Sequence, residues 1–316
     1  MVIIVVSAKK FNWKRISVII ITVLFIFSTI SLAVTKAVYD SIFTRYDTQA
    51  NIPDALSATV SSRSIHQFPS GDNLLTGYHY PGKEPERTHG LIVLVPGFHA
   101  GGDDYLWQIE SLLEYGWAVF TFDATGTRLS QGEDQIGFSQ PVLDLEAALA
   151  YIRENKLSGY KELVLMGHSR GGYAVCCALA HQKDVSAVVS ISGINSAMEG
   201  VMHMSTDAIG PVAYGNYGFL WLYQTLLFGE DILNRQAAQT ISQSDVPVLV
   251  VHGTQDDQVP MDRCSVISHK AQITSEQVEY LLCPAGHTDL MYDADGTAND
   301  ELMQHIHGFL MRCLDK

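Results

Sequence analysis

The sequence predicts an α/β fold in which a mostly parallel sheet is flanked by helices, with a helical lid insertion and an N-terminal transmembrane helix. From residue 65 onward, short β-branched apolar runs alternate with longer segments of helical spacing, an order typical of such a sheet. Several runs are almost continuously apolar, as strands buried on both faces should be. A separate uncharged apolar run near the N-terminus has the length that crosses a bilayer.

The N-terminal apolar run covers residues 16–34 and reads ISVIIITVLFIFSTISLAV. The residues before it are basic and include no acid: Lys9, Lys10, Lys14 and Arg15. Because such flanks stay in the cytoplasm, residues 1–15 are expected there and the remainder outside, as a single-pass membrane protein. A cleaved signal peptide, and hence secretion, is the alternative, since Ala33 and Ala37 each end a small-x-small motif.

The charge and the cysteine spacing argue against a nucleic-acid partner, a disulfide framework and a metal site. The 316 residues carry 20 Lys and Arg against 34 Asp and Glu, a formal net charge of −14. Five of the basic residues lie within residues 1–36, so the rest of the chain is strongly acidic and nucleic acid is not expected as a partner. The five cysteines show no C-x-x-C or metal-like spacing, so neither a disulfide framework nor a metal site is expected.

After a polar linker at residues 35–64, residues 65–316 form the main predicted domain. Six short runs are the clearest strand candidates: Leu91–Val95, Trp117–Phe122, Leu163–Met166, Ala187–Ile191, Val246–Val251 and Val278–Leu282. Apolar residues recur at helical spacing over Pro141–Asn155, and Ser169–His181 also reads as a helix. Residues 195–244 contain no clean strand and are expected to form the lid.

The segment Gly167-His168-Ser169-Arg170-Gly171 matches the pattern G-x-S-x-G. It lies between a predicted strand, LVLM, and a predicted helix, GGYAVCCALA. A nucleophile on so sharp a turn adopts a strained backbone, and small residues two positions on either side let the helix pack closely on its strand. An ordinary glycine-rich strand-to-helix turn is the alternative, but the setting favours Ser169 as a nucleophile.

With these residues the chain resembles the α/β-hydrolase superfamily, in which an acid and then a histidine follow the serine along the chain. The acid of the family's G-x-x-D-x-x-V-P pattern maps onto Asp256 in HGTQDDQVP, in preference to Asp257. The histidine maps onto His287 in PAGHTD, a loop similar to the family's G-H segment near the C-terminus. Such a histidine takes and returns a proton near neutral pH. The resemblance thus implies a triad of Ser169, Asp256 and His287.

The resemblance also implies an oxyanion hole made of two backbone amides. One belongs to Arg170, directly after the nucleophile. The other belongs to Phe98 in the loop PGFHAGG, where proline stands in place of the histidine that is common in the family. His99 in this loop, with Trp221 and Tyr223 in the aromatic-rich lid, are the candidate substrate-binding residues. The lid aromatics are expected either to line a tunnel for an acyl chain or aromatic acid, or merely to pack the lid onto the core.

These features favour a serine hydrolase that cleaves small-molecule or lipid carboxylic esters through an acyl-enzyme, with no cofactor. A serine at the turn argues against the dehalogenase and epoxide-hydrolase branches, which resemble this fold but use aspartate there. A serine peptidase of the prolyl-aminopeptidase type is the first alternative. A catalytically silent hydrolase-like domain that binds a ligand at the membrane is the second. Thioesterases and acyltransferases share the triad, and the oligomeric state is left open.

Overall fold

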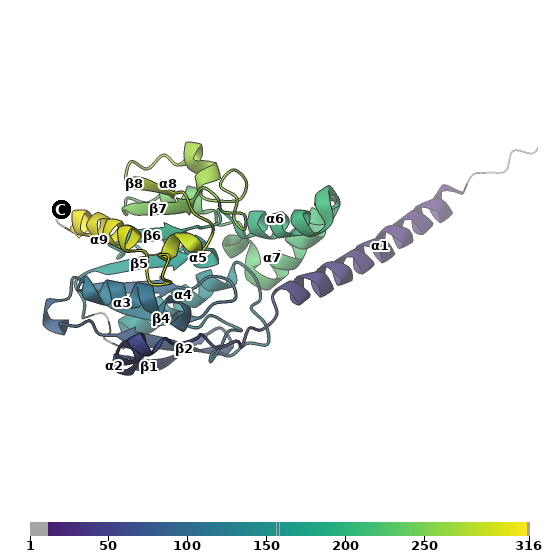
Figure 1. The fold of residues 1–316 in the computed structure, drawn as a ribbon. Coiled ribbons are helices and arrows are strands. Elements are labelled where there is room, and N and C mark those ends of the chain that lie inside the picture. The colour runs from purple at the N-terminus through teal and green to yellow at the C-terminus, as the bar shows by residue number, and fades with distance from the viewer. Residues whose placement is uncertain (1–11, 156, 158, 315–316) are drawn as a thin grey trace, which may run out of the picture.

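The computed structural model describes residues 12–155, 157 and 159–314. These residues contain an eight-stranded sheet with helices on both faces (Figure 1). The strands are β1 (Ser64–Ser70), β2 (Asn73–Tyr80), β3 (Leu91–Val95), β4 (Ala118–Phe122), β5 (Leu163–His168), β6 (Ala187–Ile191), β7 (Val248–Gly253) and β8 (Val278–Cys283). Their order is β1-β2-β4-β3-β5-β6-β7-β8. From β4 to β8 all neighbours are parallel, which confirms the predicted fold class.

The first two strands form an antiparallel hairpin that the sequence patterns did not reveal. β2 then pairs antiparallel with β4 and so joins the hairpin to the parallel strands. Gly71 and Asp72 make the two-residue turn, with Gly71 at a φ of 57°. A glycine followed by aspartate between alternating segments is a hairpin signal, but only Phe68 and Leu75 near the turn are large, apolar and fully buried.

Alternation along the strands divides the core into two layers. On β3, Val93 faces one layer and Ile92 the other, as the two-residue period of a strand requires. The first layer lies beneath α4 (Gln140–Glu154), α5 (Arg170–Ala178) and α8 (Ala237–Ser242). The second lies beneath α3 (Leu106–Glu114) and α9 (Asp300–Leu314).

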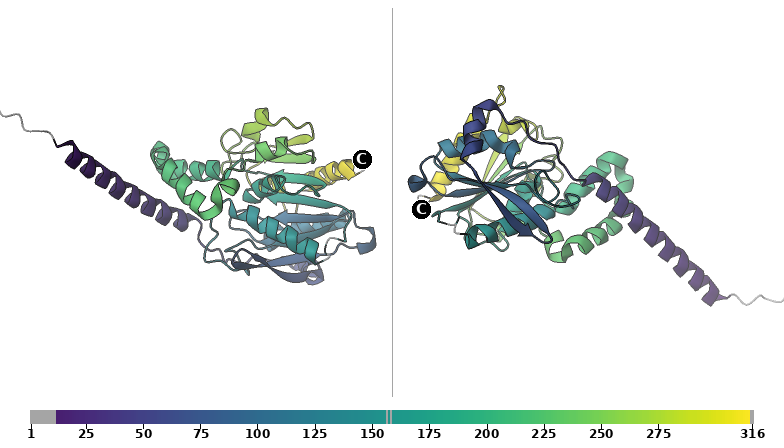
Figure 2. Two further views of the ribbon diagram at one scale, coloured as in Figure 1. Left: turned by 180° about the vertical axis from the view of Figure 1, so that it is seen from behind. Right: turned by 90° about the horizontal axis from the view of Figure 1, so that it is seen from below.

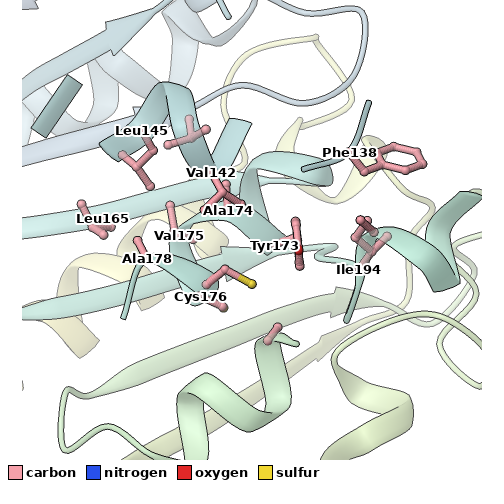
Figure 3. Packing of buried hydrophobic residues seen from close by; sticks show 14 of the residues in the cluster. Phe138, Val142, Leu145, Leu165, Tyr173, Ala174, Val175, Cys176, Ala178 and Ile194 are labelled. Atoms are coloured by element: carbon pink, nitrogen blue, oxygen red, sulfur yellow. The ribbon is translucent and has the colours of Figure 1, made fainter. Parts of the chain in front are cut away.

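Close packing in the first layer fixes α5 against the sheet. Figure 3 shows Ala174 and Val175 of α5 beside Val142 and Leu145 of α4. Cys176 is fully buried in the same cluster, as expected of a cysteine that acts as a small hydrophobic residue. The start of α5 is therefore held at a fixed place above the carboxyl end of β5.

The segment between β6 and β7 is helical. It contains α6 (Ala197–Ile209), the 3₁₀ helix η4 (Gly210–Asn216) and α7 (Tyr217–Leu233), which we call the cap. The other short elements are α2 (Ser57–Ser62), η1 (Asp54–Leu56), η2 (Pro85–Arg87), η3 (Gly102–Tyr105), η5 (Ile267–Gln272) and η6 (Asp289–Met291). The cap projects from the carboxyl side of the sheet toward the N-terminal helix (Figure 1).

The N-terminal helix α1 spans Trp13–Ile42 and is long and apolar enough to cross a membrane. The basic residues Lys9 and Lys10 lie outside the described residues. α1 continues eight residues beyond the predicted end at Val34 and packs against α7 (Figure 2). The sequence reasoning ended the helix where charges interrupt the apolar run, but Lys36 and Asp40 form an ion pair of 2.6 Å one helical turn apart.

The predicted linker at residues 35–64 is therefore largely structured. Tyr39 is buried against the cap, and its hydroxyl donates to Gln224 Oε1 at 3.2 Å. Phe43 follows the helix and packs edge-on against Phe98, with ring centroids 5.4 Å apart. Arg45 donates to three carbonyl oxygens, those of Arg128, Ser130 and Gly132. The end of α1 is thus bound directly to the domain.

Candidate active site

Ser169 occupies the turn between β5 and α5 with a φ of 57° and a ψ of −120°. A non-glycine residue at positive φ stores strain and is often functional. The flanking glycines explain the spacing of the motif. A Cβ at Gly167 would lie 2.3 Å from the carbonyl oxygen of Gly171, and one at Gly171 would lie 2.2 Å from that of Val95. Only glycine permits this approach of helix and strand.

Asp256 and His287 lie in the loops after β7 and β8 and are both buried. His287 Nδ1 and Asp256 Oδ2 are hydrogen-bonded at 2.7 Å. The other carboxylate oxygen accepts the backbone N–H groups of Gln258 and Val259 at 3.0 and 2.8 Å. Burial alone would raise the pKa of Asp256, but the hydrogen bond and charge of His287 hold it below its ordinary value. The carboxylate therefore stays ionised and fixes the imidazole.

Ser169 and His287 line the same cavity of about 460 Å³, together with residues of the loop after β3. Among the described residues, His287 contacts Asp256, His168 and Ser192 through hydrogen bonds, and none joins it to the Ser169 hydroxyl. Catalytic hydrogen bonds are often long or poorly aligned before substrate binds. The arrangement brings the three predicted triad residues together from the carboxyl ends of β5, β7 and β8.

His168, which precedes the nucleophile, joins the loops on either side of the site. Gly97 N–H donates to Tyr105 Oη at 2.9 Å, and Tyr105 Oη lies 3.0 Å from His168 Nδ1. His168 Nε2 lies 3.2 Å from the carbonyl oxygen of His287. That oxygen can only accept, so Nε2 carries the proton and Nδ1 accepts from Tyr105. Burial, assisted by the His287 ring, lowers the pKa of His168 to about 3, which keeps this imidazole neutral.

This network is a part of the site that sequence reasoning missed. The sequence places His168 only in the serine turn and points to no role for Tyr105. A histidine directly before the nucleophile was the available signal, but its partners come from distant loops and appear only once the chain is folded.

The two predicted oxyanion amides are both free to donate. Arg170 begins α5, so its N–H has no acceptor within the helix. In the loop after β3, Gly97 N–H and His99 N–H bond to Tyr105 Oη and Gln135 Oε1. Among the described residues, no acceptor is found for the Phe98 N–H between them. Phe98 lines the Ser169 cavity.

The side chain of Arg170 is a second feature that the sequence did not reveal. It is fully buried, and none of its three nitrogens has a hydrogen-bond partner in the described residues. Its guanidinium lies 5.3 Å from the centre of the Phe98 ring. Burial lowers the pKa of Arg170 to about 10, so the group is still charged at neutral pH. A positive charge thus lies behind the Phe98 loop.

The three predicted substrate-binding residues separate in the structure. His99 lines the Ser169 cavity. Trp221 instead lines a larger cavity of about 750 Å³ that contains neither Ser169 nor His287. Tyr223 is buried against α1, where its hydroxyl donates to Asp40 at 2.7 Å.

Neither Trp221 nor Tyr223 lines a cavity that contains Ser169, so their assignment to substrate binding stays a prediction. Aromatic residues on a helix more often pack two elements together than line a site. The choice between the two cavities rests on chemistry rather than on volume, because only the smaller one holds the serine and histidine.

A further cavity of about 550 Å³ extends from Ser169 and His287 toward the cap, where it reaches Met204 and Ala208 of α6. The described residues contain no group of three or more His, Cys, Asp or Glu side chains that is arranged to hold a metal ion. The chemistry available at the site is that of a serine, an imidazole held by a carboxylate, and two backbone donors.

Comparisons with known proteins bear on the fold and on the family. The chain is 29% identical over 163 residues to the bis(hydroxyethyl) terephthalate hydrolase of Streptomyces coelicolor. The aligned segment covers 49% of this chain and 50% of that protein. It thus spans about half the length of this relative. The structure resembles an esterase from Pyrococcus furiosus with a TM-score of 0.65 and 18% identity, over 86% of this chain and 99% of the other. It also resembles Est1E of Butyrivibrio proteoclasticus with bound ferulic acid, with a TM-score of 0.62, 18% identity, and coverage of 79% and 100%.

The solved structures establish the α/β-hydrolase fold. The family assignment comes from the sequence itself, since the model of the Prolyl oligopeptidase family matches residues 104–316. That segment is more than half of the chain and includes Ser169, Asp256 and His287. The chain belongs to the prolyl oligopeptidase family.

Proposed function

We propose that this protein is a serine hydrolase that cleaves carboxylic esters. The observation that carries the proposal is the 2.7 Å hydrogen bond between His287 and Asp256, in a cavity that also contains Ser169 on its strained turn. An esterase among the structural neighbours and a terephthalate-ester hydrolase among the relatives support the choice of ester.

The reaction runs through an acyl-enzyme. Ser169 Oγ attacks the ester carbonyl carbon while its proton passes to His287 Nε2, and Asp256 stabilises the imidazolium. The Phe98 and Arg170 amides bind the oxyanion. Its collapse breaks the bond to the alcohol oxygen, which takes the proton from His287. A water molecule, deprotonated by His287, then releases the acid and restores Ser169.

Labelling with a fluorophosphonate tests the nucleophile. The purified full-length protein should label at one serine, and Ser169→Ala should abolish the label. Ser61→Ala is the matched control, because Ser61 is exposed on α2 and lines neither cavity that contains Ser169. Equal labelling of wild type and Ser169→Ala would refute the assignment, and absence of labelling in the wild type would favour the silent ligand-binding domain.

A peptidase is the second candidate function, since membership of the prolyl oligopeptidase family favours amide cleavage. A panel of p-nitrophenyl esters of graded acyl length, assayed beside aminoacyl p-nitroanilides, separates the two. An esterase should give the larger kcat/KM on the esters. A consistent preference for the anilides would replace the ester proposal by the peptidase one.

We also propose that α1 is a retained membrane anchor, with the catalytic domain outside the cytoplasm. The contacts of Thr35 and Lys36 with the cap support retention, because signal cleavage after Ala37 would remove both residues. A reporter enzyme fused after Lys316 tests the orientation. A reporter that folds only outside the cytoplasm should be active in this fusion. A reporter that folds only in the cytoplasm should be inactive, and its activity would reverse the proposed topology.

A further inference from the structure

The cap contacts α1 at a position well before Val34, the residue at which the apolar run of α1 ends. Phe27 of α1 and Phe219 of α7 pack edge-on, with ring centroids 6.1 Å apart. Phe27 precedes Val34 by seven residues, which is roughly 10 Å along a helix. If the apolar run spans the bilayer, the start of α7 is therefore immersed in hydrocarbon by about this depth.

The surface of the cap suits such immersion. Residues 208–229 contain no Asp, Glu, Lys, Arg or His, although the chain as a whole carries 54 Lys, Arg, Asp and Glu residues. Several large apolar side chains in this segment are exposed, including Ile209, Val212, Tyr214 and Leu226. A contiguous exposed apolar surface that is bounded by polar sequence is typical of proteins that lie in a membrane interface.

An apolar pocket of about 230 Å³ lies between α1 and the cap. Its walls are almost entirely hydrocarbon, with Val34, Val38 and Ile42 on one side and Val201, Ala213 and Leu220 on the other. Met204 and Ala208 of α6 line both this pocket and the 550 Å³ cavity that contains Ser169 and His287. Two adjacent cavities, separated by Met204 and Ala208, thus lie between the membrane helix and the nucleophile.

We propose that the substrate is a long-chain ester resident in the bilayer, which enters sideways between α1 and the cap and places its acyl chain in the apolar pocket while its carbonyl reaches Ser169. This inference rests on the proposed ester hydrolysis and names its substrate class. An acyl chain that follows this route stays in apolar surroundings. Each methylene kept from water favours binding by up to about fourfold.

The test uses full-length protein in phosphatidylcholine vesicles and two substrates, soluble p-nitrophenyl acetate and vesicle-borne p-nitrophenyl palmitate. Ala208→Trp fills the wall shared by the two cavities, and Ala208 is exposed, so the larger side chain need not disturb the core. Leu222→Trp is the matched control, because Leu222 is a partly exposed residue of α7 that lines neither cavity.

Ala208→Trp should lower palmitate hydrolysis by about tenfold or more, the effect of excluding two or so methylenes at about fourfold each. Acetate hydrolysis should fall by a smaller factor than palmitate hydrolysis, because an acetyl group does not reach the apolar pocket, and Leu222→Trp should match wild type on both substrates. An equal loss on both esters in Ala208→Trp, or no loss on palmitate, overturns the route. Failure of the wild type on acetate together with absence of Ser169 labelling instead overturns ester hydrolysis, and this inference with it.

A binding measurement gives a readout that does not depend on turnover. Ser169→Ala protein in the same vesicles is irradiated with a palmitoyl ester that carries a diazirine near the end of its chain. Adducts should form within α1 and α6 on the pocket walls. Adducts confined to the large cavity that contains Trp221, or spread over the outer face of the cap, would overturn the route.

Discussion

His168 should make the stability of this protein depend on pH below neutrality. Its pKa is about 3 in the folded protein, against an ordinary value of 6.5. Because the folded-state pKa is the lower one, the unfolded chain binds a proton more readily. The contribution of the neutral imidazole is therefore complete above pH 6.5 and is lost progressively as the pH falls toward 3.

The magnitude follows from the separation of the two pKa values. Between them, each pH unit removes about 1.4 kcal/mol from the free energy of unfolding. At pH 5, about 1.5 units below the ordinary value, the loss relative to pH 7.5 is about 2 kcal/mol. Buried His79, whose pKa burial lowers to about 4, adds to the slope of the wild type, so the His168 share is obtained by difference.

Urea unfolding at pH 7.5 and pH 5, followed by tryptophan fluorescence in detergent micelles, measures this difference. His168→Gln keeps a side-chain donor for the His287 carbonyl but does not titrate, so its stability should fall by about 2 kcal/mol less than that of the wild type between the two pH values. His305→Gln is the control, since His305 is exposed on α9. A pH dependence of His168→Gln equal to that of the wild type would refute the reasoning.

Three further outcomes are expected. Asp256→Asn should lower kcat/KM on a soluble ester by about 10⁴-fold, because the amide no longer holds the required imidazole tautomer, and a loss below tenfold in steady-state assays would contradict the triad. Gly171→Ala should prevent the approach of α5 to the Val95 carbonyl, which thermal unfolding would show as a large fall in Tm, whereas an unchanged Tm would disprove the clash. Tyr105→Phe leaves the Gly97 N–H unpaired and should reduce unfolding free energy by about 1–3 kcal/mol in urea, with a stability equal to wild type as the contrary result.

The parts of the fold that sequence predicted are those where one local pattern suffices. Six strands could be located because runs such as Leu91–Val95 are apolar throughout and end at glycine, proline or polar residues. The hairpin of β1 and β2 was not visible, because β1 is half-exposed and the buried positions of β2 include the polar residues Thr76 and His79. The extension of α1 beyond Val34 was missed because Lys36 and Asp40 interrupt the apolar run. Only the folded structure shows that Tyr39, between them, is buried against the cap.

The candidate site follows the same division. Ser169, Asp256 and His287 each follow one of the parallel strands of the sheet, so topology alone brings them to one edge. Tyr105 and the buried guanidinium of Arg170 depend on contacts between segments far apart in the sequence, and no local pattern announces them. Their roles in catalysis, like those of the triad, are proposals for experiment.

The contacts at the end of α1 bear on how the domain moves at a membrane surface. A domain on a flexible tether turns freely and presents every face to the lipid in succession. Here the end of α1 is held to the domain at three points: Tyr39 contacts the cap, Phe43 contacts Phe98, and Arg45 donates to backbone carbonyls. With α1 inserted in a bilayer as proposed, these contacts would make the molecule one stiff body that keeps a constant face toward the lipid, and a change in the tilt of α1 would be transmitted to Phe98 through the ring of Phe43.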